Sequence, residues 1–113
     1  MKGEATNQKT DGADWHLKYN GKLPSIYITR EQAELLGWNP KLKNFSEVCA
    51  GKMLLGGIHK NMNAHLPIKN GRIWYEADIN YTSGGRNTDR IVYSNDGLIF
   101  VTYDHYETFI EIR

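Results

Sequence analysis

The stretch WYEADINYTSGGRNTDRIVYS, residues 74–94, decides how this chain folds. Apolar and polar residues alternate from residue 72 to residue 81, which is the period of a β-strand. One predicted face carries Ile73, Tyr75, Ala77 and Ile79, and the other carries Arg72, Trp74, Glu76, Asp78 and Asn80. Because Ser83-Gly84-Gly85 is a turn signal and residues 90–94 again favour a strand, we expect the two strands to pair antiparallel.

The charged residues of this stretch are unusual for strands that enter a core. Glu76 and Asp78 lie about 7 Å apart on one side of the first strand. Arg86, Thr88 and Arg90 share one side of the next segment if that segment is extended. One interpretation is an ion-pair ladder on an exposed sheet, which contributes less than about 1 kcal/mol per pair. The other is a concave polar floor in which guanidiniums surround a carboxylate.

Outside this stretch, the sequence predicts more strands on one side and helices on the other. Strands are expected at residues 98–103 and 108–112. Helices are expected at residues 11–19, from the Thr29–Gln32 capping box to Gly37, and at residues 44–50 with Asn44 as the cap. The second of these is predicted to bury Ala33, Leu35 and Leu36, whereas residues 54–71 have the composition of a loop.

These elements predict a single α+β domain over residues 1–113, with N-terminal short helices packed on a C-terminal antiparallel β-sheet meander. Residues 1–10 are polar and are expected to form a disordered tail. Cys49 is the only cysteine, so an intramolecular disulfide is excluded. Its position on the inner side of a short helix disfavours a nucleophilic role. No run of 18 apolar residues occurs in this sequence, and we expect no signal peptide among its residues, with removal of one, or of a larger parent protein, left open.

Charge is distributed unevenly along a chain whose net charge is only +1. Residues 30–72 hold seven Lys or Arg and three acids, whereas residues 73–113 hold seven acids and three Arg. The basic part hints at an anionic partner, although solvated surface charge is the simpler interpretation of the counts. Arg30 is more specific, because it begins a helix, where a cation is unfavourable. We therefore expect Arg30 to serve another purpose.

His105 supports the concave polar floor. It lies in a turn between two predicted strands, and a meander brings that turn to one end of the neighbouring strands. A carboxylate and an imidazole that face one gap form a general base and general acid pair. Arginines beside them suit a phosphate, which accepts forked hydrogen bonds. An ordinary surface histidine is the alternative.

Several motifs resemble the barnase and binase family of secreted bacterial ribonucleases. They are Glu76–Gly84, Arg86-Asn87, Asp89-Arg90-Ile91, Asp104-His105-Tyr106 and Thr108-Phe109, with Tyr27-Ile28-Thr29 and Leu36-Gly37-Trp38 upstream. The resemblance covers residues 22–113. It implies a metal-independent endoribonuclease with no cofactor, which cleaves single-stranded RNA by attack of the ribose 2′-hydroxyl on its own phosphate and leaves a 2′,3′-cyclic phosphate.

The resemblance also implies a role for each residue that matches a family motif. Glu76 takes the proton of the 2′-hydroxyl, and His105 protonates the leaving 5′-oxygen. Arg86 and Arg90 bind the phosphate, with Asp78 behind them. Tyr106 helps to form the pocket for base and ribose, and Arg30 stands where the family has a lysine and faces the phosphate. Thr88 replaces a family serine.

The sequence departs from the family in the loop that reads the base. Lys60-Asn61-Met62-Asn63 stands where the family has Ser-Asn-Arg-Glu, whose glutamate binds guanine. Asn63 has one acceptor and no charge, so we expect a relaxed or altered base preference. Asn61 is retained to place backbone amides against a base, and Met62 is expected to pack on one. His59 occupies the place of an aromatic ring that supports base stacking.

Two other settings remain open at this point. The same ribonuclease activity would suit the C-terminal toxin domain of a larger secreted protein, delivered into a target cell and blocked by an immunity protein. The chain would otherwise be a non-catalytic module that binds RNA or protein. The family implies a small acidic inhibitor that binds over Arg30, Arg86 and Arg90. We expect a monomer with no membrane partner, which is secreted or delivered as a toxin.

Overall fold

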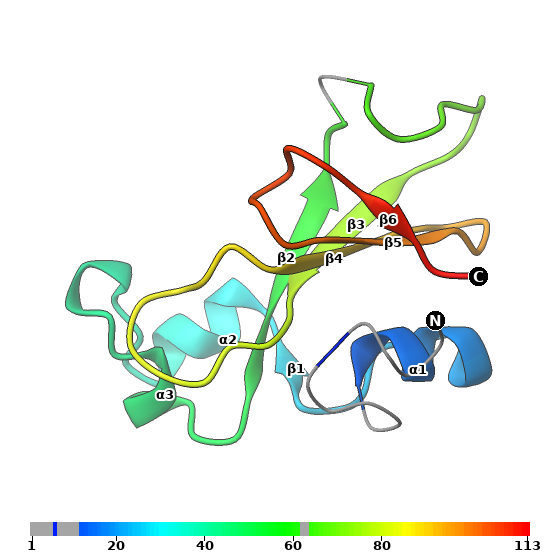
Figure 1. The fold of residues 1–113 in the computed structure, drawn as a ribbon. Helices are drawn as coiled ribbons and strands as arrows, with labels where there is room; N and C mark the ends of the chain where they lie inside the picture. The colour runs from blue at the N-terminus through cyan, green and yellow to red at the C-terminus, as the bar shows by residue number, and fades with distance from the viewer. Residues whose placement is uncertain (1–5, 7–11, 62–63) are drawn as a thin grey trace.

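The structure is a computed structural model that describes residue 6, residues 12–61 and residues 64–113. Six strands form one sheet in the order β1-β2-β3-β4-β5-β6 (Figure 1). They are β1 (Tyr27–Ile28), β2 (Met53–His59), β3 (Trp74–Asp78), β4 (Arg90–Ser94), β5 (Ile99–Thr102) and β6 (Ile110–Glu111). β1 runs parallel to β2, and the later neighbours are antiparallel. The predicted α+β class is confirmed.

Short helices precede most of the sheet. They are α1 (Ala13–Asn20), α2 (Arg30–Leu35), the 3-10 helix η2 (Pro40–Leu42) and α3 (Phe45–Val48). Figure 1 shows α2 and α3 grouped at one end of the molecule and α1 apart from them on the other side of β1. None of the helices in the described part of the chain has the length and apolar character that crossing a bilayer requires. The predicted tail lies outside the described residues except for Thr6, which is buried.

The start of α2 is built as predicted, but its buried side is not. Thr29 Oγ1 accepts a hydrogen bond from the Gln32 amide at 3.1 Å, and Gln32 Oε1 accepts one from the Thr29 amide at 2.9 Å. This capping box makes Arg30 the first helical residue. The predicted burial of Leu35 and Leu36 is wrong, because their exposed fractions are 89% and 53%. A helix of six residues turns only Ala33 fully toward the core.

The third helix is also shorter than predicted. It ends at Val48, and Asn44 precedes it without a capping hydrogen bond from its side chain. That side chain is used elsewhere, because it accepts from the Asn39 amide at 3.0 Å and donates to the Gly37 carbonyl at 3.1 Å. Asn44 therefore holds the segment between α2 and α3 in place and leaves the start of α3 to other contacts.

Residues 54–59 belong to β2, so the loop predicted for residues 54–71 is wrong at its start. Gly56 and Gly57 are the reason for the wrong prediction. They lie in a β-bulge between the pairings of Leu55 with Ala77 and of Gly57 with Glu76. Gly57 has φ 84°, a conformation that glycine adopts without strain. The bulge keeps the glycines inside a strand, and the described residues from 60 to 71 form no helix or strand.

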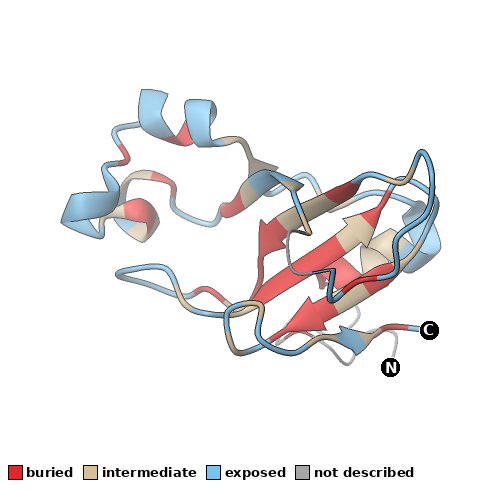
Figure 2. Cartoon of the chain, turned by 90° about the horizontal axis from the view of Figure 1, so that it is seen from above, coloured by how far each residue is buried: buried red, intermediate tan, exposed pale blue. Residues whose placement is uncertain are grey.

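Both faces of the sheet are covered, so the predicted polar face of β3 is largely buried. On one face Ala13 and Leu17 of α1 pack against Ile79, which follows β3, and against four strand residues; these are Ala77, Ile91, Ile99 and Val101. On the other face Leu66 and Phe109 cover Trp74 and Val92. Figure 2 shows buried residues along the central strands. The exposed ion-pair ladder considered from the sequence is therefore the wrong interpretation for Asp78 and Arg90.

A third group of apolar residues joins α2 and α3 to the edge of the sheet. Its buried members are Ala33, Trp38, Phe45, Cys49, Met53, Leu54 and Tyr81. Burial raises the pKa of the Cys49 thiol, which disfavours the reactive thiolate. The expectation that Cys49 packs in the interior is confirmed.

Candidate active site

The strand register divides the face opposite α1 into two halves. In the middle of β3, Glu76 pairs with Val92 of β4, and Val92 pairs with Phe100 of β5. Two residues further along β3, Asp78 pairs with Arg90, and Arg90 pairs with Thr102. The face therefore changes from apolar to polar within one repeat of the strands, and Glu76 lies at the boundary.

Asp78 is the centre of the polar half. Its Oδ2 accepts from Arg86 Nε at 2.8 Å, and its Oδ1 accepts from Arg86 Nη2 at 2.7 Å. This fork raises the pKa of Arg86, mainly through the hydrogen bonds to Asp78. Arg86 reaches Asp78 from a loop, so the extended segment considered for residues 86–89 is not formed. The Tyr27 hydroxyl donates to the Asp78 carbonyl and ties this position to β1.

Arg90 is held from two sides within the same half. Its Nη1 donates to the carbonyls of Asn87 and Asp89 at 2.7 and 2.8 Å. Its Nε lies 3.1 Å from Asp78 Oδ1, an ion-pair contact that lacks the alignment of a hydrogen bond. The side chains of Arg90 and Asp78 are only 4% and 2% exposed. None of these contacts uses Nη2 of Arg90 or Nη1 of Arg86.

Glu76 is partly exposed and has its own set of contacts. His59 Nδ1 lies 2.8 Å from Glu76 Oε1. The side chain of Tyr106 lies beside Glu76, and burial together with the charge of this carboxylate raises the pKa of Tyr106. Gly56 faces the carboxylate side chain, since a Cβ at Gly56 would lie 2.9 Å from Glu76 Cγ. The bulge in β2 thus makes room for the Glu76 side chain.

The loop after β5 presents His105. Asp104 holds this loop, because its Oδ1 accepts from the Thr102 hydroxyl and the Thr108 amide, both at 2.9 Å. Its Oδ2 accepts from the Thr108 hydroxyl at 2.6 Å. These bonds from Thr108 lower the pKa of Asp104 to about 2. His105 and Tyr106 both have positive φ, 57° and 75°, a strain that such loops support at functional sites.

The position of His105 relative to Glu76 follows from its neighbour. The His105 amide donates to the Thr88 carbonyl at 3.1 Å, which anchors the loop beside the segment that carries Arg86 and Arg90. The next residue, Tyr106, lies close enough to Glu76 for that carboxylate to raise the pKa of its phenol. The His105 side chain is exposed. The structure therefore brings the predicted base, the predicted acid and two predicted phosphate ligands to one region of the sheet.

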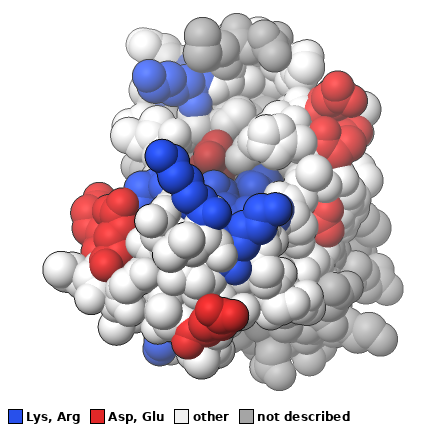
Figure 3. Space-filling model, turned by 90° about the vertical axis from the view of Figure 1, so that its left-hand side faces the viewer, with Lys and Arg blue, Asp and Glu red and all other residues white. Residues whose placement is uncertain are grey.

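Arg30 approaches the same region from the helical end. Its guanidinium carbon lies 5.0 Å from the centre of the Trp38 ring, a cation–π distance. Trp38, Lys43 and Arg86 line one hollow of about 330 Å³. Figure 3 shows Lys and Arg side chains gathered across the middle of this side of the molecule around a recessed acidic group. This surface suits an anionic chain.

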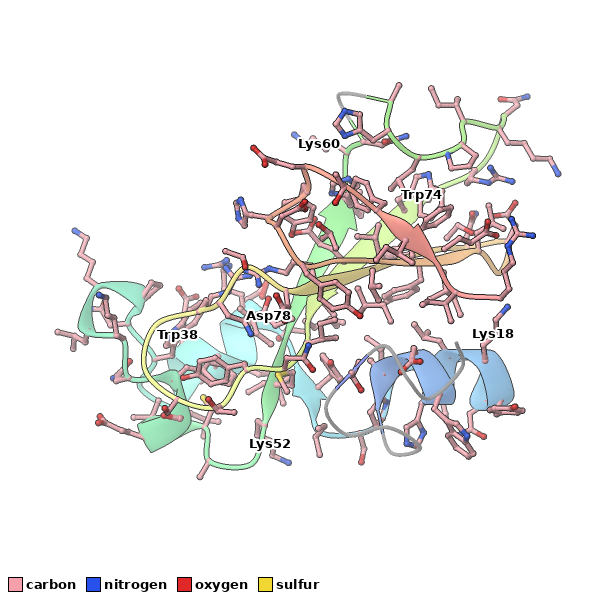
Figure 4. The ribbon with its side chains drawn as sticks, in the orientation of Figure 1. Lys18, Trp38, Lys52, Lys60, Trp74 and Asp78 are labelled. Carbon is pink, nitrogen blue, oxygen red and sulfur yellow. The ribbon has the colours of Figure 1, made fainter. Side chains whose placement is uncertain are left out.

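The loop predicted to read the base is described only in part. Figure 4 shows Lys60 beyond the end of β2, away from Trp38 and the helices. Asn61 closes the loop, because its side chain donates to the Leu66 carbonyl at 3.1 Å and accepts from the Leu66 amide at 3.2 Å. Met62 and Asn63 lie outside the described residues. The Thr88 hydroxyl donates to the Tyr103 carbonyl at 3.1 Å, so in this structure it supports a loop.

Sequence reasoning missed three features of the site, and two of them leave no signal in the sequence. The contact between His59 and Glu76 depends on the bulged register of β2. The anchoring of Arg90 by Asn87 depends on a loop conformation. The hydrogen bonds from Thr108 to Asp104 could have been predicted, since an aspartate in a turn often accepts from residues that follow it.

Within the described ranges 12–61 and 64–113, no three His, Cys, Asp or Glu side chains group as metal ligands do.

A carboxylate, an imidazole and guanidiniums gathered beside one sheet face are the groups that an enzyme cleaving phosphodiesters without a metal ion would use. Comparison with known proteins identifies the family within this class. The sequence profile of the ribonuclease family matches residues 7–113. A ribonuclease from Heyndrickxia coagulans is 50% identical over 101 residues, which cover 89% of this chain and 92% of the relative.

Two further relatives agree. The ribonucleases of Bacillus intermedius and Bacillus pumilus are each 50% identical over 101 residues, which cover 89% of this chain and 62% of each relative. The chain belongs to the ribonuclease family, and it is an endoribonuclease of the barnase and binase type. The predicted resemblance is confirmed.

Proposed function

We propose that this endoribonuclease cleaves single-stranded RNA by making a ribose 2′-oxygen displace the 5′-oxygen of the next nucleotide, with no metal ion in the step. One observation carries the proposal. The partly exposed carboxylate of Glu76 lies one strand repeat from the Asp78–Arg86–Arg90 cluster on the same face. A base and a cluster of fixed cations are what this displacement requires.

The step assigns a separate task to each group. Glu76 takes the proton of the 2′-hydroxyl as the new 2′-oxygen–phosphorus bond forms. The bond from phosphorus to the 5′-oxygen breaks, and His105 gives that oxygen a proton. The product keeps a 2′,3′-cyclic phosphate, which water can open later by the reverse use of the two groups.

The cations stabilise the charge that grows on the phosphate oxygens. Asp78 holds the fork of Arg86 through Nε and Nη2, which leaves Nη1 to bind phosphate. Arg90 is fixed by backbone carbonyls through Nη1, which leaves Nη2. Side chains that are already fixed need no reorganisation when the charge develops, and this is the main source of such catalysis. Arg30, held over Trp38, adds a third cation.

We also propose a relaxed or altered base preference. The position predicted to read guanine is Asn63, and the amide of asparagine offers one acceptor and no charge. Asn61 closes the loop 61–66 and Tyr106 stacks on His59, so both support the base pocket. Cleavage rates on dinucleotides with each base 5′ of the bond test this directly. Strict selectivity for guanine would contradict it.

The mechanism is tested with an RNA that contains one scissile position. We expect cleavage to persist in excess EDTA, to yield a 2′,3′-cyclic phosphate by mass spectrometry, and to stop when that one ribose is 2′-deoxy. Loss of cleavage in EDTA, or a 5′-phosphate product, would refute the proposal. Binding of the RNA without any cleavage would instead support the non-catalytic module.

The basic surface also fits a protein inhibitor. An acidic inhibitor would place carboxylates where the RNA phosphates bind, against Arg30, Arg86 and Arg90. Such an inhibitor fits an enzyme that is secreted, or that enters a target cell as the toxin domain of a larger protein. Expression in bacterial cells with and without the acidic inhibitor of a related ribonuclease tests whether the enzyme is toxic inside a cell and whether such an inhibitor blocks it. We expect growth arrest without the inhibitor and rescue by it, and the rescue should be lost when acidic residues of the inhibitor are changed to basic ones.

A further inference from the structure

A histidine lies against the carboxylate that we propose as the general base. His59 is the last residue of β2, and its Nδ1 lies 2.8 Å from Glu76 Oε1. The two side chains are only 16% and 21% exposed. His59 pairs with Trp74 in the register of β2 and β3, so the imidazole and the carboxylate project from neighbouring strands on one face.

Aromatic neighbours fix the orientation of the His59 ring. The Tyr106 ring stacks on it with a centroid distance of 5.2 Å and an angle of 17°. Phe109 meets it at 6.3 Å and 64°. A ring held on these sides keeps Nδ1 directed at Glu76. The contact is therefore a fixed feature of the fold.

The charged and titratable side chains near this contact come from several elements. They are Glu76 and Asp78 from β3, Arg90 from β4, Arg86 from the loop before β4, Asp104, His105 and Tyr106 from the loop after β5, and Lys60, the next residue in the chain. A hydrogen bond donated directly to a carboxylate oxygen favours its ionised form.

We propose that His59 is a positioning residue for the reaction: its Nδ1–H donates to Glu76 Oε1, orients the carboxylate toward the 2′-hydroxyl and keeps it ionised in mildly acidic solution. This inference rests on the proposed function, because it takes Glu76 as the base. A bare aromatic ring at position 59 would keep the stacking with Tyr106 but would lack the donor. The effect of the donor can therefore be separated from the effect of the ring.

The test is the pH profile of kcat/KM for His59→Phe on a dinucleotide substrate. We expect the acidic limb of the profile to move to higher pH by about one unit, the size of shift that loss of one charge-assisted hydrogen bond produces. The plateau should fall by about threefold to tenfold, because the carboxylate loses the donor that orients it toward the 2′-hydroxyl. The control His16→Phe, on α1, should leave the profile unchanged. An acidic limb of His59→Phe that superimposes on that of the wild type would overturn the inference.

Variants at Glu76 separate this inference from the proposed function. If Glu76→Gln is inactive and the His59→Phe profile is unshifted, only the inference about His59 is wrong. If Glu76→Gln cleaves as fast as the wild type, the proposed base is wrong and the inference falls with it. If Glu76→Gln is inactive and the His59→Phe profile is shifted, both stand.

A spectroscopic test is independent of activity. The ¹⁵N chemical shifts of the His59 ring report which nitrogen carries the proton when the imidazole is neutral. We expect the Nδ1–H tautomer in the wild type and loss of that preference in Glu76→Ala, where the acceptor is missing. A wild-type ring protonated mainly on Nε2 would refute the inference even if His59→Phe failed to fold.

Discussion

The two halves of the sheet face opposite α1 are both buried, but by different means. The apolar half contains Trp74, Val92 and Phe100, covered by Leu66 and Phe109. The polar half contains Asp78, Arg90 and Thr102, two residues further along the same strands. Burial of the apolar side chains stabilises the fold by about 1.5–3 kcal/mol each. A buried ion pair, in contrast, gains little net stability because both charges lose their hydration.

The polar half contributes little net stability, which fits the phosphate-binding role that we propose for its arginines. Its charges hold one another in fixed positions, and Glu76 lies at the boundary where it keeps some contact with solvent. The role of base that we propose for Glu76 suits this position, because full burial would disfavour a charged carboxylate and full exposure would weaken its contacts. The following predictions test the two halves and their boundary.

The largest effect on kcat/KM is expected at Glu76, which lies at the boundary between the two halves, and at His105 in the loop after β5. Glu76→Gln and His105→Ala should each lower kcat/KM by about 10²- to 10⁴-fold, the usual contribution of an acid or base. Their unfolding free energies should stay within about 1 kcal/mol of the wild type. Initial rates on a fluorogenic RNA and urea unfolding measure the two quantities. Glu107→Gln, in the same loop as His105, is the matched control and should retain full activity.

The next largest effect is expected for a variant that disrupts the polar half. Asp78→Asn removes the charge that pairs with Arg86 and with the buried Arg90. Because an unpaired charge then stays buried, the unfolding free energy should fall by about 3–5 kcal/mol. Urea unfolding measures this. The control Glu111→Gln breaks the exposed pair with Arg113 and should cost less than about 1 kcal/mol. Equal losses in the two variants would contradict the distinction between the halves.

A third variant breaks the apolar half. Leu66→Ala opens a cavity beneath Trp74 and should cost about 2–5 kcal/mol of unfolding free energy. Leu36→Ala removes the same atoms from an exposed position and should change it by less than about 0.5 kcal/mol. We expect Leu66→Ala to retain its activity at temperatures where it is folded. Loss of activity in folded Leu66→Ala would show that the two halves are coupled.

A smaller effect is expected at Gly56, which makes room in β2 for the side chain of Glu76. In Gly56→Ala the new Cβ would lie 2.9 Å from Glu76 Cγ and 3.1 Å from the Glu76 carbonyl oxygen. The strain should cost about 1–3 kcal/mol of unfolding free energy. Displacement of the carboxylate should lower kcat/KM roughly tenfold. Gly85→Ala is the steric control for stability, because its Cβ would meet only the flexible Lys43 side chain at 3.4 Å.

The smallest effect concerns the loop that carries His105. Hydrogen bonds from Thr108 lower the pKa of Asp104 from 3.8 to about 2. A lowered pKa in the folded state means that ionised Asp104 stabilises the fold above about pH 4 and that this contribution is lost as pH falls through about 2. The melting temperature of Asp104→Asn should therefore fall less than that of the wild type between pH 4 and pH 2. Parallel curves for the two proteins would show that Asp104 contributes nothing there.

Local patterns in the sequence predicted much of the fold. The alternation of residues 72–81 and the turn at residues 83–85 led to β3 and β4 in the observed antiparallel pairing. The Thr29–Gln32 capping box led to the start of α2. These features depend on residues close in the chain, so their physical cause can be read without coordinates.

The wrong predictions have a different cause. β2 was missed because Gly56 and Gly57 indicate a loop unless a neighbouring strand accommodates them as a bulge. Leu35 and Leu36 were expected inside because apolar residues usually lie on the covered side of a helix. Whether a side of α2 is covered depends on where the helix packs, and that is a property of the whole molecule.

By itself, the sequence determined the α+β class, the order of the strands after residue 72, and the identity of the charged residues near Glu76. Only the tertiary structure decided that Asp78 and Arg90 are buried together, that Asp104 holds the turn of His105, and that His59 contacts Glu76. The reason is the range of the interactions. Periodicity and capping act over a few residues, whereas these contacts depend on the register between strands and on loops that close over a sheet face.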